Sequence, residues 1–484
     1  MRSPHLAAGL SLLLMLGGCV PKLQGAVREA QIDLPSDYGQ QEGTPQAAPL
    51  PDWRAHFQDP QLVALIETAL AHNQELALID QELRIADAEV NARRGEYLPR
   101  LDFFAGAETE KVGRYTSQGA NDANTEIAPG VEFPEPLPDF GVGLSASWEI
   151  DAWGRLRNSR RAAQERYLQT TEGRNFAVTE LVAEIAGAWY ELQALHAQMA
   201  VLDQNVEILE NSLRIVRLQR ESAQVTQLAV QRFEAELLEA KSERFQVRQE
   251  ITEAENAINL LCARYPQPLP VSALALEDLG APTVLAGQPG QLLERRPDVR
   301  AAERGLEAAR LDVKAAKALF YPTLSLDAEL GYEAFSLARM GATPESILYN
   351  LALGVAAPLL NRQEIKAQYV AASAQQMQAT VEYERTVLQA YLEVSNQVSA
   401  ISNQDASYHL QAERVAVLER SIESATRLFG SARADYLEVL TTRQELLFAQ
   451  MALIETRQEQ LTARAELYRA LGGGWDQTPR EEAP

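Results

Sequence analysis

The chain has 484 residues, 46% of them hydrophobic, and a formal net charge of −23 at pH 7. This length allows two or three ordinary domains with ample apolar surface for a core. No run of Lys or Arg is longer than two residues, so the chain lacks the basic footprint that neutralises phosphates, and we expect no nucleic-acid partner.

The first residues predict a secretory signal peptide. A basic start precedes an apolar run at 6–16, which is too short to cross a bilayer as a helix. The run closes with Leu-Gly-Gly before Cys19, and this ending resembles a bacterial lipobox, in which cleavage precedes a cysteine that then carries lipid. We predict residues 1–18 as the signal peptide and Cys19 as the lipidated first residue. An ordinary signal peptide with an incidental cysteine is the alternative.

Residues 19–60 are rich in Pro, Gly and Gln and show no apolar period, which predicts a lipid-anchored tether. A helical period begins near Leu62 and continues to Tyr97, where Pro99 stops the helix.

Two segments of apolar and polar alternation follow, at 100–110 and 140–151, and they predict strands. In the first, Leu101, Phe103 and Ala105 share one face. Two similar segments occur later in the chain, at 323–333 and 349–358. The sequence therefore predicts four strands.

A long helix is predicted after each strand pair, at 155–222 and 362–430, and a returning helix follows each one, at 226–263 and 434–471. In the first long helix, apolar residues recur at alternating steps of three and four from residue 178 to residue 216, which indicates a heptad seam. The second seam includes Gln397, Gln404 and Gln411, so we expect a wetter contact there.

The two halves of the chain repeat one another. Residues 206–261 match 415–470 at an offset of 209, and residues 73–105 match 296–328 at an offset of 223. Because the offset falls by 14, one copy carries an insertion, which we place in the polar stretch 108–138. The chain is one structural unit written twice.

We therefore predict a mainly α-helical fold with internally duplicated helical hairpins and a small β part. The expected order is a signal peptide at 1–18, a tether at 19–60, repeat 1 at 61–270, an inter-repeat linker at 271–295, repeat 2 at 296–472 and a C-terminal tail at 473–484.

Strands of about ten residues cross a bilayer when they are tilted. Four strands cannot close into a barrel, however, and open edges are not tolerated in lipid. Since single-chain bacterial barrels have at least about eight strands, several chains must pool theirs. Aromatic residues near the strand ends suit a membrane interface: Phe103, Phe104, Trp148, Tyr332 and Tyr349. The alternative is a small soluble sheet packed on the helices.

Three further motifs accompany the lipobox: Arg-Arg-Pro-Asp-Val-Arg at 295–300, Tyr-Leu-Glu-Val-Leu at 436–440 and Leu-Tyr-Arg-Ala-Leu-Gly-Gly-Gly-Trp at 467–475. With the repeated order of helix, two strands, long helix and returning helix, the chain resembles the TolC-like outer-membrane efflux channels, particularly the lipoprotein branch of tripartite multidrug pumps.

The resemblance implies a homotrimer in the outer membrane of a Gram-negative bacterium. Twelve pooled strands would form a transmembrane β-barrel, and the helices would form an α-barrel through the periplasm. The partners would be a periplasmic adaptor protein and an inner-membrane transporter, with the chain anchored through Cys19.

In this family the periplasmic gate lies near the helix turns, and the matching segment here runs from Phe429 to Glu438. Its gate candidates are Phe429, Arg433, Asp435 and Glu438, of which Arg433 lies one place before the family's occasional gate arginine. Two residues depart from the family pattern: Ala432 replaces a usual Gly, and Thr441 replaces a common acid. We hypothesise that Arg433 and Asp435 pair within or between subunits, and that Glu438 faces the lumen. The alternative is a solvated turn.

No pattern indicates catalysis, a cofactor or a metal. The five histidines are never within four residues of one another, and no P-loop or nucleophile elbow occurs. We predict a passive exit duct for drugs or other small molecules. The alternatives are a duct for protein secretion, a periplasmic coiled-coil adaptor or scaffold lipoprotein, and an envelope enzyme.

Overall fold

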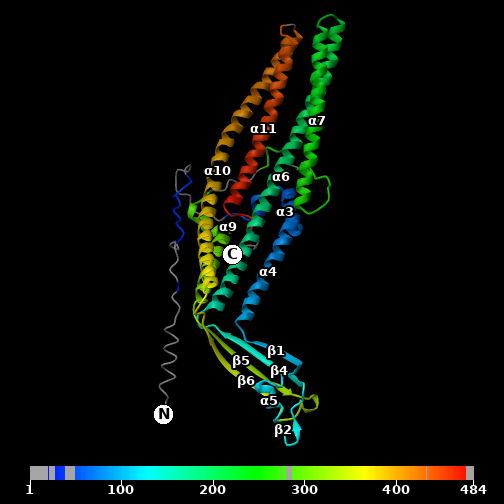
Figure 1. Ribbon diagram of the computed structural model, residues 1–484. Coiled ribbons are helices and arrows are strands. Elements are labelled where there is room, and N and C mark those ends of the chain that lie inside the picture. Colours follow the sequence, from blue (N-terminus) through cyan, green and yellow to red (C-terminus); the bar gives the residue numbers. More distant parts are fainter. Residues whose placement is uncertain are drawn as a thin grey trace, which may run out of the picture. The chain divides into compact units, whose positions relative to one another are not determined.

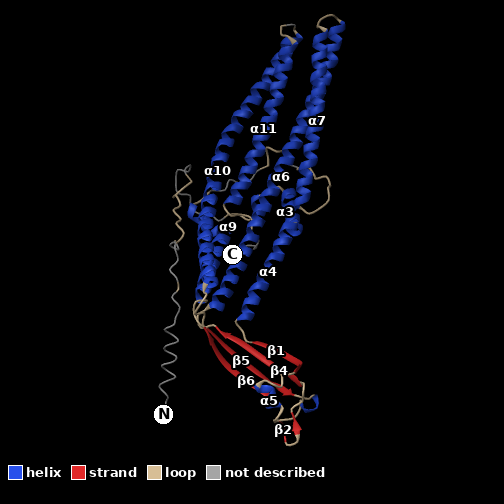
Figure 2. Cartoon of the chain, viewed as in Figure 1, coloured by secondary structure: helices blue, strands red, loops and turns tan. Residues whose placement is uncertain are grey.

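The computed structural model describes residues 20, 28–38, 50–272, 274–279, 286–431 and 433–475. The predicted signal peptide, Cys19, Ala432 and most of the C-terminal tail lie outside the described residues. Figures 1 and 2 show long helices and one principal sheet.

Ahead of the first repeat lies α2 (Trp53–His56). The elements of the first repeat are α3 (Pro60–His72), α4 (Gln74–Glu96), β1 (Arg100–Glu110), α5 (Ser117–Asp122), β2 (Glu126–Ala128), β3 (Val131–Glu132), β4 (Leu137–Ile150), α6 (Arg155–Glu221) and α7 (Gln227–Leu261). The inter-repeat linker holds the 3-10 helix Pro289–Gln291 and α8 (Leu292–Arg295). The elements of the second repeat are α9 (Pro297–Ala318), β5 (Thr323–Ala334), the 3-10 helix Leu337–Arg339, β6 (Ile347–Ala356), α10 (Gln363–Gly430) and α11 (Tyr436–Ala470).

These elements form two compact units, and each unit is built from both repeats. Apart from N-terminal residues, unit 1 holds residues 84–168 and 304–381, and unit 2 holds residues 30–83, 169–303 and 382–475. The sheet lies in unit 1. The compact units therefore cut across the repeats that the sequence matches define.

The insertion lies where the change of offset places it. Between β1 and β4 there are 26 residues, which form α5 and the short hairpin of β2 and β3, whereas 12 residues join β5 to β6. The difference is the 14 residues by which the offset falls. The short strands β2 and β3 were not predicted, because two or three residues carry no measurable alternation.

The core of unit 2 follows the heptad seam of α6. Ile185, Leu192 and Leu209 are fully buried along it. On α10 the seam is buried at Val387, Ala390 and Val394, and beyond them it is mostly half-buried, with Val415 as the exception. The expected difference between the two seams is therefore present.

Asp59 links three segments of unit 2. One carboxylate oxygen accepts from the backbone N–H of Gln61 at 2.9 Å and so caps α3, with Pro60 at the first helical position. The other oxygen accepts from Nε1 of Trp189 on α6 at 3.0 Å and from the hydroxyl of Ser272 at 2.9 Å. One buried carboxylate thus fixes α3, α6 and the segment after α7.

The tether prediction is wrong for residues 53–60. Trp53 and Phe57 are buried in the core of unit 2, and α2 forms here. Farther upstream, Tyr38 stacks on Tyr391 of α10 with ring centroids 5.3 Å apart, and the Tyr391 hydroxyl donates to the Asp37 carbonyl at 3.1 Å. The aromatic residues bind this Pro-rich segment to the helices through contacts that have no sequence period.

The inter-repeat linker also has partners in unit 2. Its Leu276 and Leu279 are buried, and the guanidinium of Arg457 on α11 donates to the Leu279 carbonyl at 2.6 Å. Within the described ranges, no helix combines the length and the apolar character that a membrane crossing requires.

His56 is a fully buried histidine whose two ring nitrogens have no hydrogen-bond partner among the described residues. Its ring stacks on that of Tyr468, with centroids 4.3 Å apart. Burial lowers the pKa of His56 from 6.5 to about 4, because the charged imidazolium would lose its hydration.

We therefore predict an acid-sensitive stability. As the pH falls from about 6.5 to about 4, the unfolded chain takes up a proton at His56 that the folded chain refuses, so the free energy of unfolding drops by up to about 3 kcal/mol. In thermal unfolding from pH 7.5 to 4.5, His56→Phe should lose less stability than wild type. His72→Phe, at an exposed position on α3, is the control and should follow wild type. Equal pH dependence of all three proteins would contradict the prediction.

Candidate functional site

The sheet has one continuous apolar face. Its order is β1-β4-β5-β6, all antiparallel. The register aligns Phe103 with Leu144, Leu330 and Tyr349 in one row across all four strands. These side chains are exposed by 46–79%. The described helices leave this face uncovered, whereas the soluble-sheet alternative requires helices packed on it.

The opposite face is polar and carries small residues. Asp102, Ser145, Glu329 and Asn350 form one of its rows. An apolar face beside a polar face is the pattern of a strand between lipid and an aqueous lumen.

At one point the polar face requires glycine. A Cβ on Gly143 would lie 2.6 Å from the Leu330 carbonyl oxygen, and a Cβ on Gly331 would lie 2.4 Å from that of Val142. The ring of Phe104 covers Gly143. Phe104 therefore belongs to the polar face, and its assignment to the aromatic interface was wrong, because it is adjacent to the outward-facing Phe103 on one strand.

Both edge strands of the sheet, β1 and β6, are paired on one side only among the described residues. Among the described residues, no strand pairs with the outer edge of β1 or of β6. Backbone N–H and C=O groups along such edges are costly in lipid, where water cannot satisfy them. An apolar exposed sheet with two free edges is therefore incomplete as a single chain.

The residues predicted for the gate lie in the turn between α10 and α11 and at the helix ends beside it. Arg433, Asp435 and Glu438 are exposed, and Phe429 is half-buried. Within the described part of one chain, no ion pair joins Arg433 to Asp435. Glu438 lies with Thr441 along a groove of about 680 Å³ between α10 and α11.

The two helix turns differ in their capping. Before α7, the hydroxyl of Thr226 accepts from the Ala229 N–H at 3.3 Å, and Ala223 adopts a left-handed φ of 60°. Before α11, Asp435 occupies the N-cap position, but its side chain makes no capping hydrogen bond. Its carboxylate is thus not committed to the helix end.

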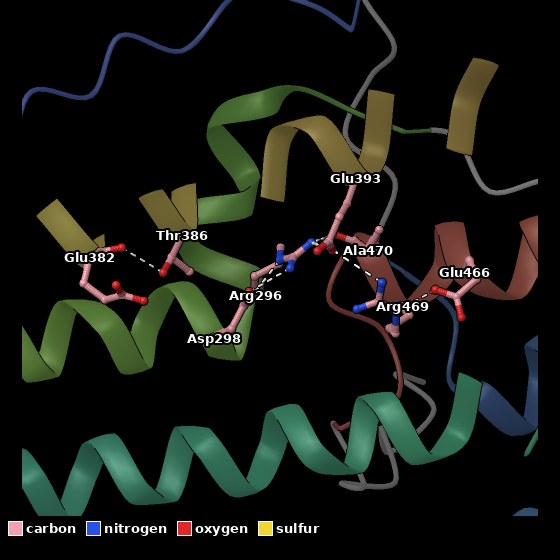
Figure 3. A network of polar contacts seen from close by, with 8 residues as sticks. All are labelled: Arg296, Asp298, Glu382, Thr386, Glu393, Glu466, Arg469 and Ala470. Carbon is pink, nitrogen blue, oxygen red and sulfur yellow. Dashed lines mark hydrogen bonds and ion pairs between the residues drawn. The ribbon is translucent and has the colours of Figure 1, made fainter. Parts of the chain in front are cut away.

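A buried arginine explains the motif at 295–300 (Figure 3). Arg296 is 2% exposed. Its guanidinium donates to Asp298 at 2.7 Å, to Glu393 on α10 at 2.8 Å and to the Ala470 carbonyl at the end of α11 at 3.0 Å. Burial lowers the pKa of Arg296, but the two carboxylates outweigh it and raise the pKa above its usual value.

The C-terminal motif contributes Arg469 to this network and places Gly472 against Arg295. Arg469 donates to Glu466 at 2.8 Å and contacts Glu393 at 3.5 Å. A Cβ on Gly472, whose φ is 84°, would lie 2.7 Å from the Arg295 carbonyl oxygen. The segment directly after α11 can therefore approach Arg295, just before α9, only with glycine at this position.

An acidic hollow of about 470 Å³ lies beside this network in unit 2. Glu75, Glu180, Glu184, Glu393 and Glu466 line it together with Arg469. Burial is the main cause that raises the pKa of Glu180 and of Glu184.

Cys262 is the one cysteine within the described ranges. It is 2% exposed, and burial raises the pKa of its thiol. Within the same ranges, no group of three or more His, Cys, Asp or Glu side chains is placed to hold a metal ion.

Two long helical hairpins and an amphipathic sheet with open edges define a membrane channel subunit. The sequence matches the family model described as "Outer membrane efflux protein" over residues 65–264 and 288–473. The chain belongs to the outer membrane efflux protein family, and the predicted resemblance is confirmed.

Relatives match along most of their length. The pyoverdine export outer membrane protein OpmQ of Pseudomonas aeruginosa is 28% identical over 467 residues, which are 96% of each chain. The cation efflux system protein CusC of Escherichia coli K12 is 27% identical, over 87% of this chain and 88% of that one. The toluene efflux pump outer membrane protein TtgI of Pseudomonas putida is 28% identical, over 96% and 97%.

Solved structures share the fold. A crystal structure of CusC aligns with a TM-score of 0.80 at 23% identity and covers 94% of this chain and 99% of that one. The open state of the MtrE outer membrane channel of Neisseria gonorrhoeae aligns with a TM-score of 0.81 at 23% identity and covers 95% and 98%. The predicted fold class, mainly helical with a four-stranded sheet, is confirmed.

Two adjacent residues of β6 test which face meets lipid. Leu351 lies on the apolar face, and Asn350 lies on the polar face. A lysine at a lipid-facing position near mid-strand costs about 2–4 kcal/mol. Leu351→Lys should therefore strongly reduce the folded protein in purified outer membranes, measured by protease resistance, whereas Asn350→Lys should accumulate as wild type does. Equal loss in both variants would refute the assignment of the faces.

Proposed function

We propose that three copies of this chain form the outer-membrane exit duct of a tripartite efflux system. The family establishes an outer-membrane efflux channel. The observation that supports the trimer is the sheet, whose exposed apolar face and open edges need strands from other chains. Three copies would pool twelve strands into one β-barrel, with the helices as an α-barrel in the periplasm.

The proposed duct is passive and carries out no reaction. The partners are a periplasmic adaptor and an inner-membrane transporter, and the transporter supplies the energy. The relatives named above are described for pyoverdine export, cation efflux and toluene efflux, all of which are small cargoes. We propose drugs or other small molecules as cargo here, in preference to secreted proteins.

The adaptor or scaffold alternative fits the structure less well. A periplasmic scaffold would be in water on all sides, and hydration of a sheet face with exposed Phe103, Leu351 and Leu353 would be unfavourable. A membrane-inserted sheet needs this face.

Planar-bilayer recordings test the duct directly. Protein purified from outer membranes should insert and produce steady single-channel currents at both polarities. Purified protein that never conducts, although it is folded and inserted, would contradict the proposed function.

We propose that Cys19 carries the lipid anchor in the outer membrane. The motif before Cys19 supports this, although the residue lies outside those that the structure describes. Intact mass of the mature wild-type chain should exceed that of residues 19–484 by the lipid, and the Cys19→Ala precursor should gain none. A wild-type chain without added mass would refute lipidation.

We propose that the turn before α11 gates the duct, with Arg433 and Asp435 paired between subunits in the closed state. Asp435 has no capping bond within its own chain, so its carboxylate is available for such a pair.

Glu438, exposed at the same turn, is proposed to face the lumen and favour cations. Glu438→Gln should lower the cation-to-anion permeability ratio measured from reversal potentials across a salt gradient. The reason is that the substitution removes one carboxylate per subunit, and hence all three carboxylates of the proposed ring. The control is Glu413→Gln, at an exposed site on α10 away from the turn. Unchanged selectivity in Glu438→Gln would show that this carboxylate is not part of a selective ring.

A further inference from the structure

Four segments join the helices to the sheet in unit 1, at 90–100, 151–161, 313–322 and 357–366. Together they carry eleven Lys or Arg residues and three acidic residues. The whole chain has the opposite balance, with 67 acidic and 44 basic residues. Positive charge is therefore concentrated where the helices meet the strands.

Two of the three acids in these segments pair with cations, and the third, Glu364, accepts a hydrogen bond from Gln368 at 3.3 Å. Arg93 contacts Glu96 at 3.1 Å, and Arg157 contacts Asp151 at 3.1 Å. Six other cations have exposed side chains with no hydrogen bond or ion pair to any residue that the structure describes. These junction cations are Arg94, Arg160, Arg161, Lys314, Lys317 and Lys366.

The junction cations lie close to the sheet along the chain. Each is within about eleven residues of a strand end in the sequence. They come from α4, α6, α9 and α10, which are the four helices that enter or leave the sheet.

Aromatic residues lie between the apolar strands and these cations. The indole N–H of Trp148 donates to the Tyr97 carbonyl at 3.1 Å. Trp153 stacks on Tyr321 with ring centroids 5.1 Å apart. Beside α10, Leu360 is 89% exposed. Apolar residues followed by aromatic residues and then by cations is the order found from bilayer core to headgroups.

Helix stability does not explain the cations at the start of α6. This helix has no acidic residue in its first turn, and Arg155, Arg157, Arg160 and Arg161 all lie in its first two turns. The positive end of the helix dipole disfavours cations there. Arg155 and Arg157 are paired with acids, but Arg160 and Arg161 are not. An anion from outside the chain would neutralise them.

We propose that the junction cations bind the phosphate groups of anionic phospholipids in the leaflet on the helical side of the β-barrel. This inference rests on the proposed insertion of the sheet into the outer membrane. Each Lys or Arg near an anionic lipid surface contributes about a fivefold preference, and the effect is screened by salt. The apolar strands in the bilayer core and the charged contacts at the headgroups on the helical side would together hold the barrel at a fixed depth in the membrane.

The test compares two variants with the same change in charge. The junction variant is Arg160→Gln, Arg161→Gln, Lys314→Gln and Lys317→Gln. The control removes four exposed cations far from the sheet in sequence: Arg220→Gln, Arg232→Gln, Arg414→Gln and Arg420→Gln. Native mass spectrometry of the full-length protein in non-ionic detergent measures bound phosphatidylglycerol against phosphatidylcholine, with and without inorganic phosphate as competitor.

Wild type and the control should prefer phosphatidylglycerol, and the junction variant should lose at least tenfold of that preference. A junction variant with wild-type preference would overturn the inference while leaving the channel function intact. If millimolar inorganic phosphate displaced phosphatidylglycerol as readily as phosphatidylcholine, the inference would also be overturned. Dissociation of the junction variant into single subunits in both lipids would overturn it as well, because it would assign these cations to contacts between chains. A wild-type protein absent from outer membranes would instead refute the proposed function.

Discussion

The open sheet is the constraint on which the rest of the structure depends. Four strands present lipid-compatible side chains on one face and acids, serines and glycines on the other, but β1 and β6 have free edges. In lipid every backbone polar group must be paired, so the sheet can enter a membrane only together with other copies. The duplication provides each chain with two strand pairs, and each pair brings its own helical hairpin. An assembly that closes the sheet must therefore also gather the hairpins.

Unit 2 holds the hairpins together by buried contacts of several kinds. Asp59 connects α3 to α6, and Arg296 connects the start of α9 to α10 and to the end of α11. Removing one partner from such a buried charged network leaves the other charges uncompensated, which typically costs about 3–5 kcal/mol. The seam of α6 is apolar and largely buried, whereas that of α10 contains glutamines and is mostly half-buried beyond Val394. The second hairpin is thus the less firmly packed of the two, and it also carries the turn proposed as the gate.

Local periodicity accounts for most of what could be predicted. Alternation at Leu101, Phe103 and Ala105 placed the apolar face correctly, and the change of offset placed the insertion. The errors concern contacts that no local period encodes. Trp53 and Phe57 pack on distant helices from within a Pro-rich segment. For Arg296, local rules explained only its neighbours Pro297 and Asp298, since Glu393 and Ala470 are far away in the sequence. At the turn between α10 and α11, the family resemblance, and no local period, indicated Arg433, Asp435 and Glu438 as gate candidates. Their proposed partners would lie on other chains.

The central claim is that several chains close one sheet, and the number of chains in the assembly tests it most directly. Light scattering with the detergent contribution subtracted, applied to protein extracted from purified outer membranes, measures that number. The account predicts three times the mass of the mature chain. A monomer recovered from the soluble periplasmic fraction would contradict it, because the apolar face and both edges of the sheet would then be stable in water.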